Sequence, residues 1–191
     1  MIVGCRRRRM MTVSMMLGAA LVAWTASSVG RAAGPVTVTR VASPEKALRF
    51  EVIVPGSLDQ VWAAFTTTDG LAAWLWRDVR VDARPGGDWL ALFPGSTGGG
   101  TIVSLAPKQQ LVIAALAPDR FPTVRKERTR ATFEFTAVTP DSTDVTLVQT
   151  GWKAGDEWDA AYDYLADGNS ELLNQLYQRF VTGPVVWPQG R

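Results

Sequence analysis

The sequence predicts an α+β domain in which a curved antiparallel sheet of about six or seven strands packs against one long C-terminal helix. Two observations lead to this fold class. Through the middle of the chain, short runs that alternate between apolar and polar residues are joined by short turns, which favours antiparallel pairing. The segment 157–180 then spaces its apolar residues three, four or seven positions apart, as one face of a helix does.

The first half of this pattern predicts one strand followed by two short helices. The strand covers 48–54, where large apolar residues alternate with polar ones. The first helix begins after Ser57, and Gln60 completes a capping-box pattern with it. The second helix covers 71–76 and turns Trp74 inward.

The other predicted strands follow in sequence and are separated by turn residues. They cover 78–83, 88–93, 101–107, 110–117, 129–138 and 143–150. The glycine-rich stretches GGDW and GSTGGG lack the spacing of a phosphate-binding loop, so we interpret them as turns. An arginine-rich loop over 120–130 is interpreted as a solvated surface that pairs in part with Asp119 and Glu127, and the alternative is a contact with an anionic head group or a membrane surface.

The long helix carries a Gly-Asn pair at the centre of its apolar face. Its acidic residues lie mostly outside that face, and several stand near the start of the helix, where they suit its dipole. Gly168 weakens a helix by about 1 kcal/mol relative to Ala and allows a backbone or a ligand to approach closely. Asn169 places an amide on an otherwise apolar wall, where it either bonds to a backbone group of the sheet or faces a cavity.

The first 33 residues have the layout of a secretory signal peptide. An arginine cluster at 6–9 precedes an apolar run over 10–24, and small residues offer cleavage sites as far as Ala33. The run is shorter than the roughly 20 residues that a membrane-spanning helix needs. We therefore expect a periplasmic or secreted protein. The alternative is an uncleaved N-terminal membrane anchor, with membrane contact limited to this segment.

The amino-acid composition excludes several kinds of catalytic site, metal site and partner. The chain has no histidine, which excludes serine–histidine and cysteine–histidine catalysis and histidine-ligated zinc. Its single cysteine, Cys5, precedes the apolar run, so the exported chain would depend on its core and not on disulfides. Without Arg31 and the arginines at 6–9, 15 basic residues face 18 acidic ones. This balance argues against nucleic acid as a partner.

Six segments in order suggest a family: VWAAFTTTDGLAAWL, ARPGGDW, GTIVSLAPKQQLVIA, ATFEFTAV, DVTLVQTGW and DEWDAAYDYLADGNSELLNQL. Together they resemble the START-like SRPBCC superfamily, in the branch similar to the C-terminal domain of the activator of the ninety-kilodalton heat-shock protein's ATPase. The resemblance covers roughly 48–181. It implies a helix-grip fold, in which the sheet wraps around the last helix and leaves a cavity where relatives bind lipids, sterols, polyketides or other apolar molecules.

The chain departs from that family at one informative position. Asn169 stands where relatives commonly have a tryptophan, and an amide leaves volume that an indole would fill. We divide the chain into a signal peptide at 1–33, a lead at 34–47, the START-like domain at 48–181 and a flexible tail at 182–191.

The leading hypothesis is an exported domain that binds a small hydrophobic or amphipathic ligand as a carrier or sensor, without catalysis, cofactor or metal. The candidate cavity residues are Asn169, Tyr162, Leu165, Trp158, Gln149, Trp89 and Phe133. A second hypothesis is a cyclase- or dehydratase-like enzyme that uses a pocket carboxylate or Tyr162, and a buried acid with a raised pKa would favour it. The third is a co-chaperone-like interaction module.

Overall fold

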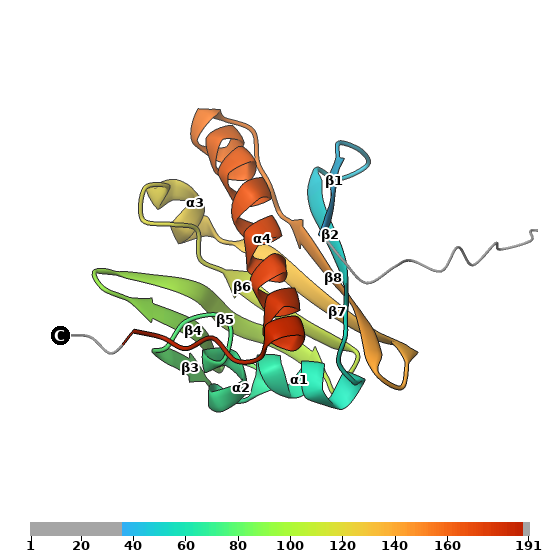
Figure 1. Cartoon of the computed structure of the whole chain (residues 1–191). Helices are drawn as coiled ribbons and strands as arrows, with labels where there is room; N and C mark the ends of the chain where they lie inside the picture. Colours follow the sequence, from blue (N-terminus) through green and yellow to red (C-terminus); the bar gives the residue numbers. More distant parts are fainter. Residues whose placement is uncertain (1–35, 189–191) are drawn as a thin grey trace, which may run out of the picture. The chain divides into compact units, whose positions relative to one another are not determined.

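An antiparallel sheet wrapped around one long helix forms the described part of the chain, residues 36–188 of this computed structural model (Figure 1). The predicted signal segment lies outside these residues. The elements are β1 (Thr37–Val41), β2 (Ala47–Val54), α1 (Leu58–Thr66), α2 (Thr68–Ala72), β3 (Val79–Val81), β4 (Asp88–Phe93), β5 (Ser96–Ala106), β6 (Gln110–Ala115), α3 (Pro122–Glu127), β7 (Thr129–Thr139), β8 (Ser142–Thr150) and α4 (Asp156–Thr182). None of the described helices is long and apolar enough to cross a membrane.

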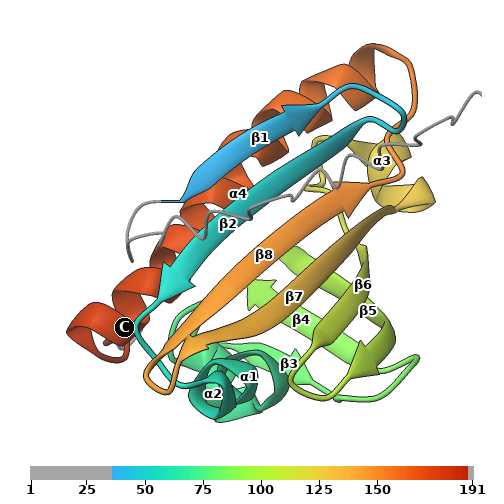
Figure 2. The same ribbon diagram turned by 90° about the vertical axis from the view of Figure 1, so that its right-hand side faces the viewer.

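The sheet has eight strands in the order β1-β2-β8-β7-β6-β5-β4-β3, and all neighbours are antiparallel. Register shifts in β5, between Ile102 and Ser104, and in β7, between Ala137 and Thr139, interrupt the ladder. Such bulges increase local twist and bend the sheet. The α4 helix lies along β1 and β2 on the concave side, and α1 and α2 close one end of the sheet (Figures 1 and 2).

Aromatic side chains fill the interior next to α1. The ring of Phe65 is fully buried and lies within 6.3 Å, centroid to centroid, of four other buried rings, those of Trp74, Trp89, Phe133 and Phe135. The indole nitrogens of Trp74 and Trp89 donate to the backbone oxygens of Ala64 and Phe65, both at 2.9 Å. These bonds remove the cost of burying a polar N–H, so both indoles belong to the core.

The predicted α+β helix-grip class is confirmed, with one more strand than the upper prediction. The additional strand, β1, lies in the segment that we expected to be an irregular lead; it is short, largely exposed and at the edge of the sheet. The capping box at Ser57 and Gln60 is present, and Trp74 is buried as predicted. The second helix begins earlier than expected, at Thr68, because the Thr67 side chain accepts the Gly70 N–H and caps it.

The glycine run at 98–100 is not a turn but part of β5, which pairs with β4 and β6. A Cβ on Gly99, whose φ is +94°, would lie 2.1 Å from the Trp89 carbonyl oxygen. A Cβ on Gly100 would lie 2.2 Å from the Ala114 carbonyl oxygen. Glycine is therefore required here because the neighbouring backbones approach too closely for any side chain.

Two other segments are more ordered than the sequence predicts. The arginine-rich loop contains α3, in which Pro122 occupies the first turn. In the predicted flexible tail, residues 183–188 contact α2: Val185 N–H donates to Ala73 O at 2.9 Å, and Trp187 Nε1 donates to Ala72 O at 2.7 Å. Residues 183–188 are therefore attached to the domain by hydrogen bonds.

Candidate ligand-binding cavity

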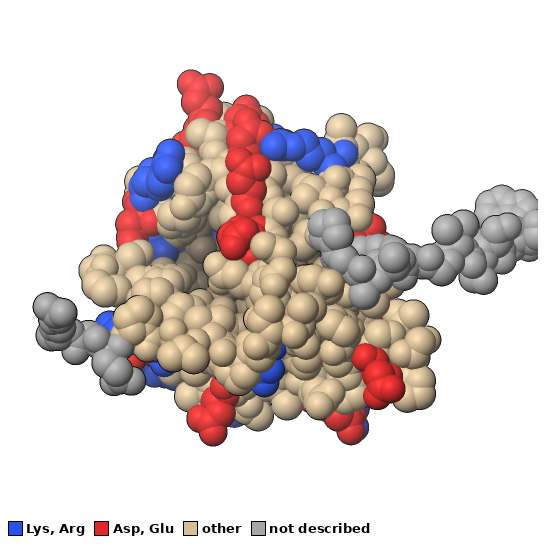
Figure 3. All heavy atoms as spheres, in the orientation of Figure 1, with Lys and Arg blue, Asp and Glu red and all other residues tan. Residues whose placement is uncertain are grey.

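A cavity of about 340 Å³ separates α4 from the β4–β5 hairpin. The helix lies against β1 and β2, so the opposite end of the curved sheet stands away from it, and Figure 3 shows the resulting hollow beside α4. The walls come from α4, β4, β5, the segment 116–118 and Leu75, which follows α2. They include Leu75, Trp89, Ala91, Phe93, Gly98, Gly99, Leu116, Pro118, Tyr164, Leu165, Gly168, Asn169 and Leu172. Most of these groups are apolar, as is usual in small-molecule sites.

An inner recess of about 90 Å³ continues the cavity towards the middle of the sheet. The two spaces share six lining residues, namely Trp89, Gly99, Leu116, Leu165, Asn169 and Leu172. The recess adds residues of β6, β7 and β8, among them Phe133, Leu147 and Gln149. The cavity therefore reaches from the molecular surface to the inward face of the sheet.

A short hydrogen-bonded chain of polar side chains crosses this inner wall. Asn169 Nδ2 donates to Gln149 Oε1 at 2.7 Å, and Gln149 Nε2 donates to Thr129 Oγ1 at 2.7 Å. Gln149 is only 3% exposed, so its amide depends on these two partners. Within residues 36–188 the side-chain oxygen of Asn169 has no protein hydrogen-bond partner, which leaves an acceptor at the cavity.

The Gly-Asn pair does not interrupt α4, which runs without a break from Asp156 to Thr182. A Cβ added to Gly168 would have no heavy atom of another element within 4 Å, so no neighbouring backbone approaches the helix closely at this glycine. The space beside it belongs to the cavity. Asn169 bonds to a side chain of the sheet and not to its backbone, and it also faces the cavity, so both alternatives for this residue hold in part.

Five of the seven candidate residues from the sequence line this one space. Trp89, Leu165 and Asn169 border both parts, and Gln149 and Phe133 border the recess. The five come from β4, β7, β8 and α4, whose inward faces meet at this space.

The other two candidates are elsewhere. Tyr162 is buried on the β2 side of α4, where its hydroxyl donates to Ala47 O at 3.0 Å and its ring contacts Trp152 edge-on. Trp158 belongs to a separate apolar cluster with Phe121 and Val124 beneath α3. Both lie on the apolar stripe of α4, but that stripe covers more of the sheet than the cavity does, so the expectation that they line it is wrong.

Two aromatic residues at the cavity mouth were not predicted from the sequence. Tyr164 is 42% exposed and Phe93 is 37% exposed, and both line the outer part. Tyr164, Gly168 and Leu172 are each four residues apart and so lie along one side of α4, a spacing that could have indicated a second face. Phe93 is the last residue of β4, and its position in the sequence gave no sign that it would line the cavity.

The rim beside α3 is held by ionic contacts. Arg125 pairs with Asp119 at 3.0 Å and also donates to the Thr97 carbonyl oxygen of β5 at 3.0 Å. Asp119 in turn accepts a hydrogen bond from Ser96. Of the two predicted acidic partners, Asp119 therefore pairs within the loop, whereas Glu127 pairs with Lys153.

Glu157 attaches α3 to α4. Its carboxylate accepts the backbone N–H groups of Thr123 at 2.6 Å and Val124 at 3.1 Å. Partial desolvation tends to raise the pKa of Glu157, but the hydrogen bonds from Thr123 and Val124 outweigh it, and the pKa lies below its usual value. Glu157 therefore stays ionised at neutral pH.

The lining of both parts of the cavity is neutral: no Asp, Glu, Lys or Arg of residues 36–188 borders it. Tyr164 supplies the one phenol hydroxyl among the lining residues in that range. The described residues also contain no cluster of acidic, histidine or cysteine side chains that could hold a metal ion. The arrangement provides apolar contact and an amide for orientation, but no carboxylate for acid–base chemistry.

Comparison with solved structures gives the same fold. The solution structure of the Aha1 dimer from Colwellia psychrerythraea has a TM-score of 0.59 and 18% identity, and the match covers 72% of this chain and 97% of that one. A protein from Mesorhizobium loti has a TM-score of 0.60 and 17% identity, over 73% of this chain and 99% of that one. A conserved protein of unknown function from Enterococcus faecalis has a TM-score of 0.59 and 16% identity, and the match covers 79% of this chain and 80% of that one.

A search of curated proteins found no significant match. The sequence model of the Activator of Hsp90 ATPase homolog 1-like protein family, in contrast, matches residues 56–180, well over half of the chain. This range runs from the end of β2 almost to the end of α4 and includes all the elements that enclose the cavity. The chain therefore belongs to the Activator of Hsp90 ATPase homolog 1-like family, within the START-like SRPBCC superfamily that its sequence segments resemble.

Proposed function

We propose that this domain binds a small hydrophobic or amphipathic molecule between its sheet and α4, as a carrier or sensor without chemistry of its own. The observation that carries the proposal is the apolar cavity of about 340 Å³ with its connected recess. This volume falls within the range of about 300–1,000 Å³ that is usual for small-molecule sites. Family membership supports a ligand-binding or a co-chaperone-like domain.

Apolar burial supplies the affinity in this proposal, and the amides supply orientation. Each Å² of apolar surface that the ligand buries contributes roughly 25 cal/mol. The free acceptor of Asn169 favours a ligand with a hydroxyl or N–H group at its inner end, because a buried acceptor without a partner costs about 1–3 kcal/mol. Gln149 fixes the position of Asn169 through their 2.7 Å hydrogen bond.

Fluorescence titration with N-phenylnaphthylamine, a neutral dye that brightens in apolar surroundings, tests the proposal. The purified chain should bind about one dye molecule. Asn169→Trp places an indole in the cavity, so it should abolish binding while the circular dichroism spectrum stays unchanged. Native mass spectrometry after gentle purification should also detect a bound cell-derived molecule.

The matched control is Gln178→Trp, which adds the same indole to an exposed position of the same helix. It should bind the dye as the unmodified chain does. Equal binding by both tryptophan variants would show that the dye does not enter the cavity, and a chain that never binds the dye and is always recovered empty would contradict the proposal.

The co-chaperone-like role is the second candidate, and the description of the matching family favours it. Its test is the ATPase rate of a purified ninety-kilodalton chaperone with and without this chain. The enzyme hypothesis, which uses a pocket carboxylate or Tyr162, receives no such support, because neither a carboxylate of residues 36–188 nor Tyr162 lines the cavity.

We also propose that the domain acts outside the cytoplasm. The arginine cluster and the apolar run within residues 1–33 support export. Cell fractionation followed by intact-mass measurement tests this. A periplasmic or secreted form that begins near residue 34 is expected, and a full-length cytoplasmic form would contradict it.

A further inference from the structure

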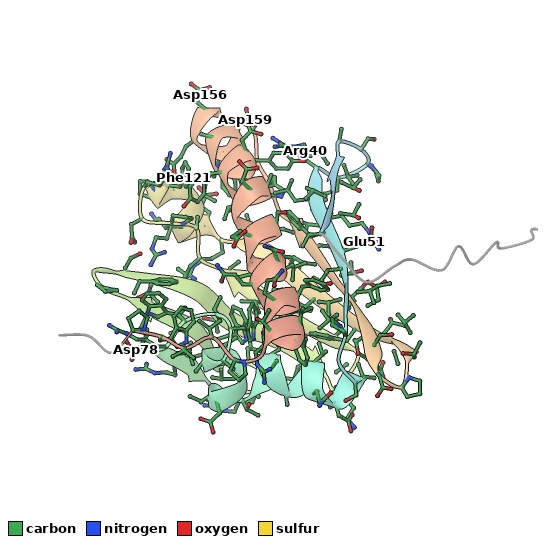
Figure 4. The ribbon with its side chains drawn as sticks, in the orientation of Figure 1. Arg40, Glu51, Asp78, Phe121, Asp156 and Asp159 are labelled. Carbon is green, nitrogen blue, oxygen red and sulfur yellow. The ribbon has the colours of Figure 1, made fainter. Side chains whose placement is uncertain are left out.

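Arg120 lies at the cavity mouth on a platform of two aromatic rings. Its guanidinium carbon is 4.7 Å from the ring centroid of Tyr164, which lines the cavity, and 4.9 Å from that of Phe121. The two rings are themselves 5.6 Å apart. Figure 4 labels Phe121 where α3 faces α4, and Figure 3 shows basic side chains on that side of the hollow.

These ring contacts hold the guanidinium group of Arg120 at the cavity mouth, and its N–H groups have no hydrogen-bond partner among residues 36–188. A guanidinium group contacts rings through its flat faces, and its five N–H donors point outward in the plane. Because the side chain is already held over Tyr164 and Phe121, an arriving anion would pay less of the rotamer entropy that a long flexible side chain normally loses.

One carboxylate next to Arg120 in the sequence and one on α4 are already paired with other arginines. Among residues 36–188, the neighbouring carboxylate Asp119 pairs with Arg125 at 3.0 Å, and on α4 Asp163 pairs with Arg40. Arg120 itself has no ion pair within that range. The donors at the rim are therefore available, next to an apolar cavity with a neutral lining.

We propose that the ligand of this cavity is an amphipathic anion: its apolar body occupies the space between α4 and the β4–β5 hairpin, and its carboxylate, sulfate or phosphate binds the guanidinium of Arg120 at the mouth. This inference rests on the proposed function and adds a ligand class to it. The molecule is bound singly from solution and not at a membrane surface.

A pair of related dyes tests this on the full chain. N-phenylnaphthylamine is neutral, and anilinonaphthalene sulfonate has the same two ring systems plus one anionic group. The unmodified chain should bind the sulfonate more tightly. Arg120→Gln should weaken sulfonate binding about fivefold, the upper end for an exposed ion pair, and leave the neutral dye unaffected. Arg120→Lys should restore most of the loss. Decanoate should displace the sulfonate better than decanol does.

Arg130→Gln is the matched control, because Arg130 is an exposed arginine in β7 and its loss changes the net charge equally. Equal weakening by Arg120→Gln and Arg130→Gln would overturn the inference in favour of general attraction. Binding of the neutral dye without any preference for the sulfonate would overturn it too, while the proposed function would stand. Failure of both dyes would remove the proposed function itself. Sulfonate binding that is seen only with phosphatidylglycerol vesicles would assign Arg120 to a membrane surface and overturn the inference.

Discussion

The cavity exists because several positions on its two walls carry little or no side chain. Gly168 on α4 and Gly98 and Gly99 on β5 all line it. The glycines have different causes: Gly99 is required by its backbone conformation and the closeness of Trp89, whereas Gly168 has open space beside it. A glycine that costs helix stability and serves no close packing is best explained by the space it leaves for a ligand.

Gly168→Ala should therefore raise the free energy of unfolding by about 1 kcal/mol, since alanine is the better helix former and its methyl group meets nothing. Urea denaturation followed by tryptophan fluorescence measures this. Gly100→Ala is the contrasting variant and should destabilise the domain, because its Cβ would lie 2.2 Å from Ala114 O. Destabilisation by Gly168→Ala would show that the helix needs the glycine for itself.

The amide pair on the inner wall has a testable coupling. Gln149→Leu should lower the free energy of unfolding by about 1–3 kcal/mol, because Asn169 and Thr129 lose their shared partner in a buried place. In the double variant Gln149→Leu with Asn169→Leu, the loss should be smaller than the sum of the single losses. Additive losses in denaturation experiments would mean that the 2.7 Å contact does not couple the two residues.

Among the elements, one strand and the C-terminal helix were the most predictable from the sequence. The strand at 48–54 and the helix at 157–180 each bury a complete face, so their apolar periods are clear. The short or irregular elements were less predictable. In β1 most residues are exposed and no face is buried, β5 carries three glycines near its start that propensity assigns to turns, and α3 is stabilised by Glu157 from a distant part of the chain.

This dependence of α3 on Glu157 leads to a pH prediction. The folded-state pKa of Glu157 is lowered, so its contribution to stability is present above its unfolded value and disappears as the pH falls through the folded value. Glu157→Gln should thus reduce protection of the Thr123 and Val124 amides from hydrogen exchange at neutral pH. The difference between the two chains should disappear as the pH falls through the lowered folded-state pKa of Glu157, because the side chain at position 157 is then uncharged in both.

Asp156→Asn is the control for the Glu157 variant. Asp156 lies in the same first turn of α4 and interacts with the same helix dipole, but it is exposed and forms no hydrogen bond or ion pair with the described residues of α3. Its substitution should leave the exchange of Thr123 and Val124 unchanged. Equal effects of the two variants would mean that helix-dipole electrostatics, and not the hydrogen bonds of Glu157, stabilise α3.

At the scale of the whole domain, the cavity results from the off-centre position of α4 on the sheet, which local sequence patterns do not indicate. The α4 helix packs against β1 and β2 at one end of a curved sheet, so the other end is left apart from it (Figures 1 and 2). Periodicity correctly indicated that Gln149 and Asn169 face inward. It could not indicate which inward residues meet a neighbour and which meet open space, and for that reason Tyr162 and Trp158 were wrongly assigned to the cavity.

A row of three aromatic rings connects the C-terminal tail to the mouth of the cavity. The ring centroid of Trp187 lies 5.1 Å from that of Trp76, and the Trp76 centroid lies 5.1 Å from that of Phe93 at the cavity mouth. Trp76 also donates to Leu92 O at 3.1 Å and so fixes its ring to β4. The tail is therefore part of the support of the cavity rim.

Truncation after Gly183 should consequently have two effects. It removes the tail's hydrogen bonds to α2 and the contact with Trp76, which should lower the free energy of unfolding by about 2 kcal/mol. It should also weaken binding of N-phenylnaphthylamine, because Trp76 and Phe93 lose their outer neighbour. A chain that ends at Pro188 keeps every one of these contacts and should match the full chain in both measurements. Unchanged stability and dye binding after the longer truncation would mean that the rim is held by β4 and α2 alone.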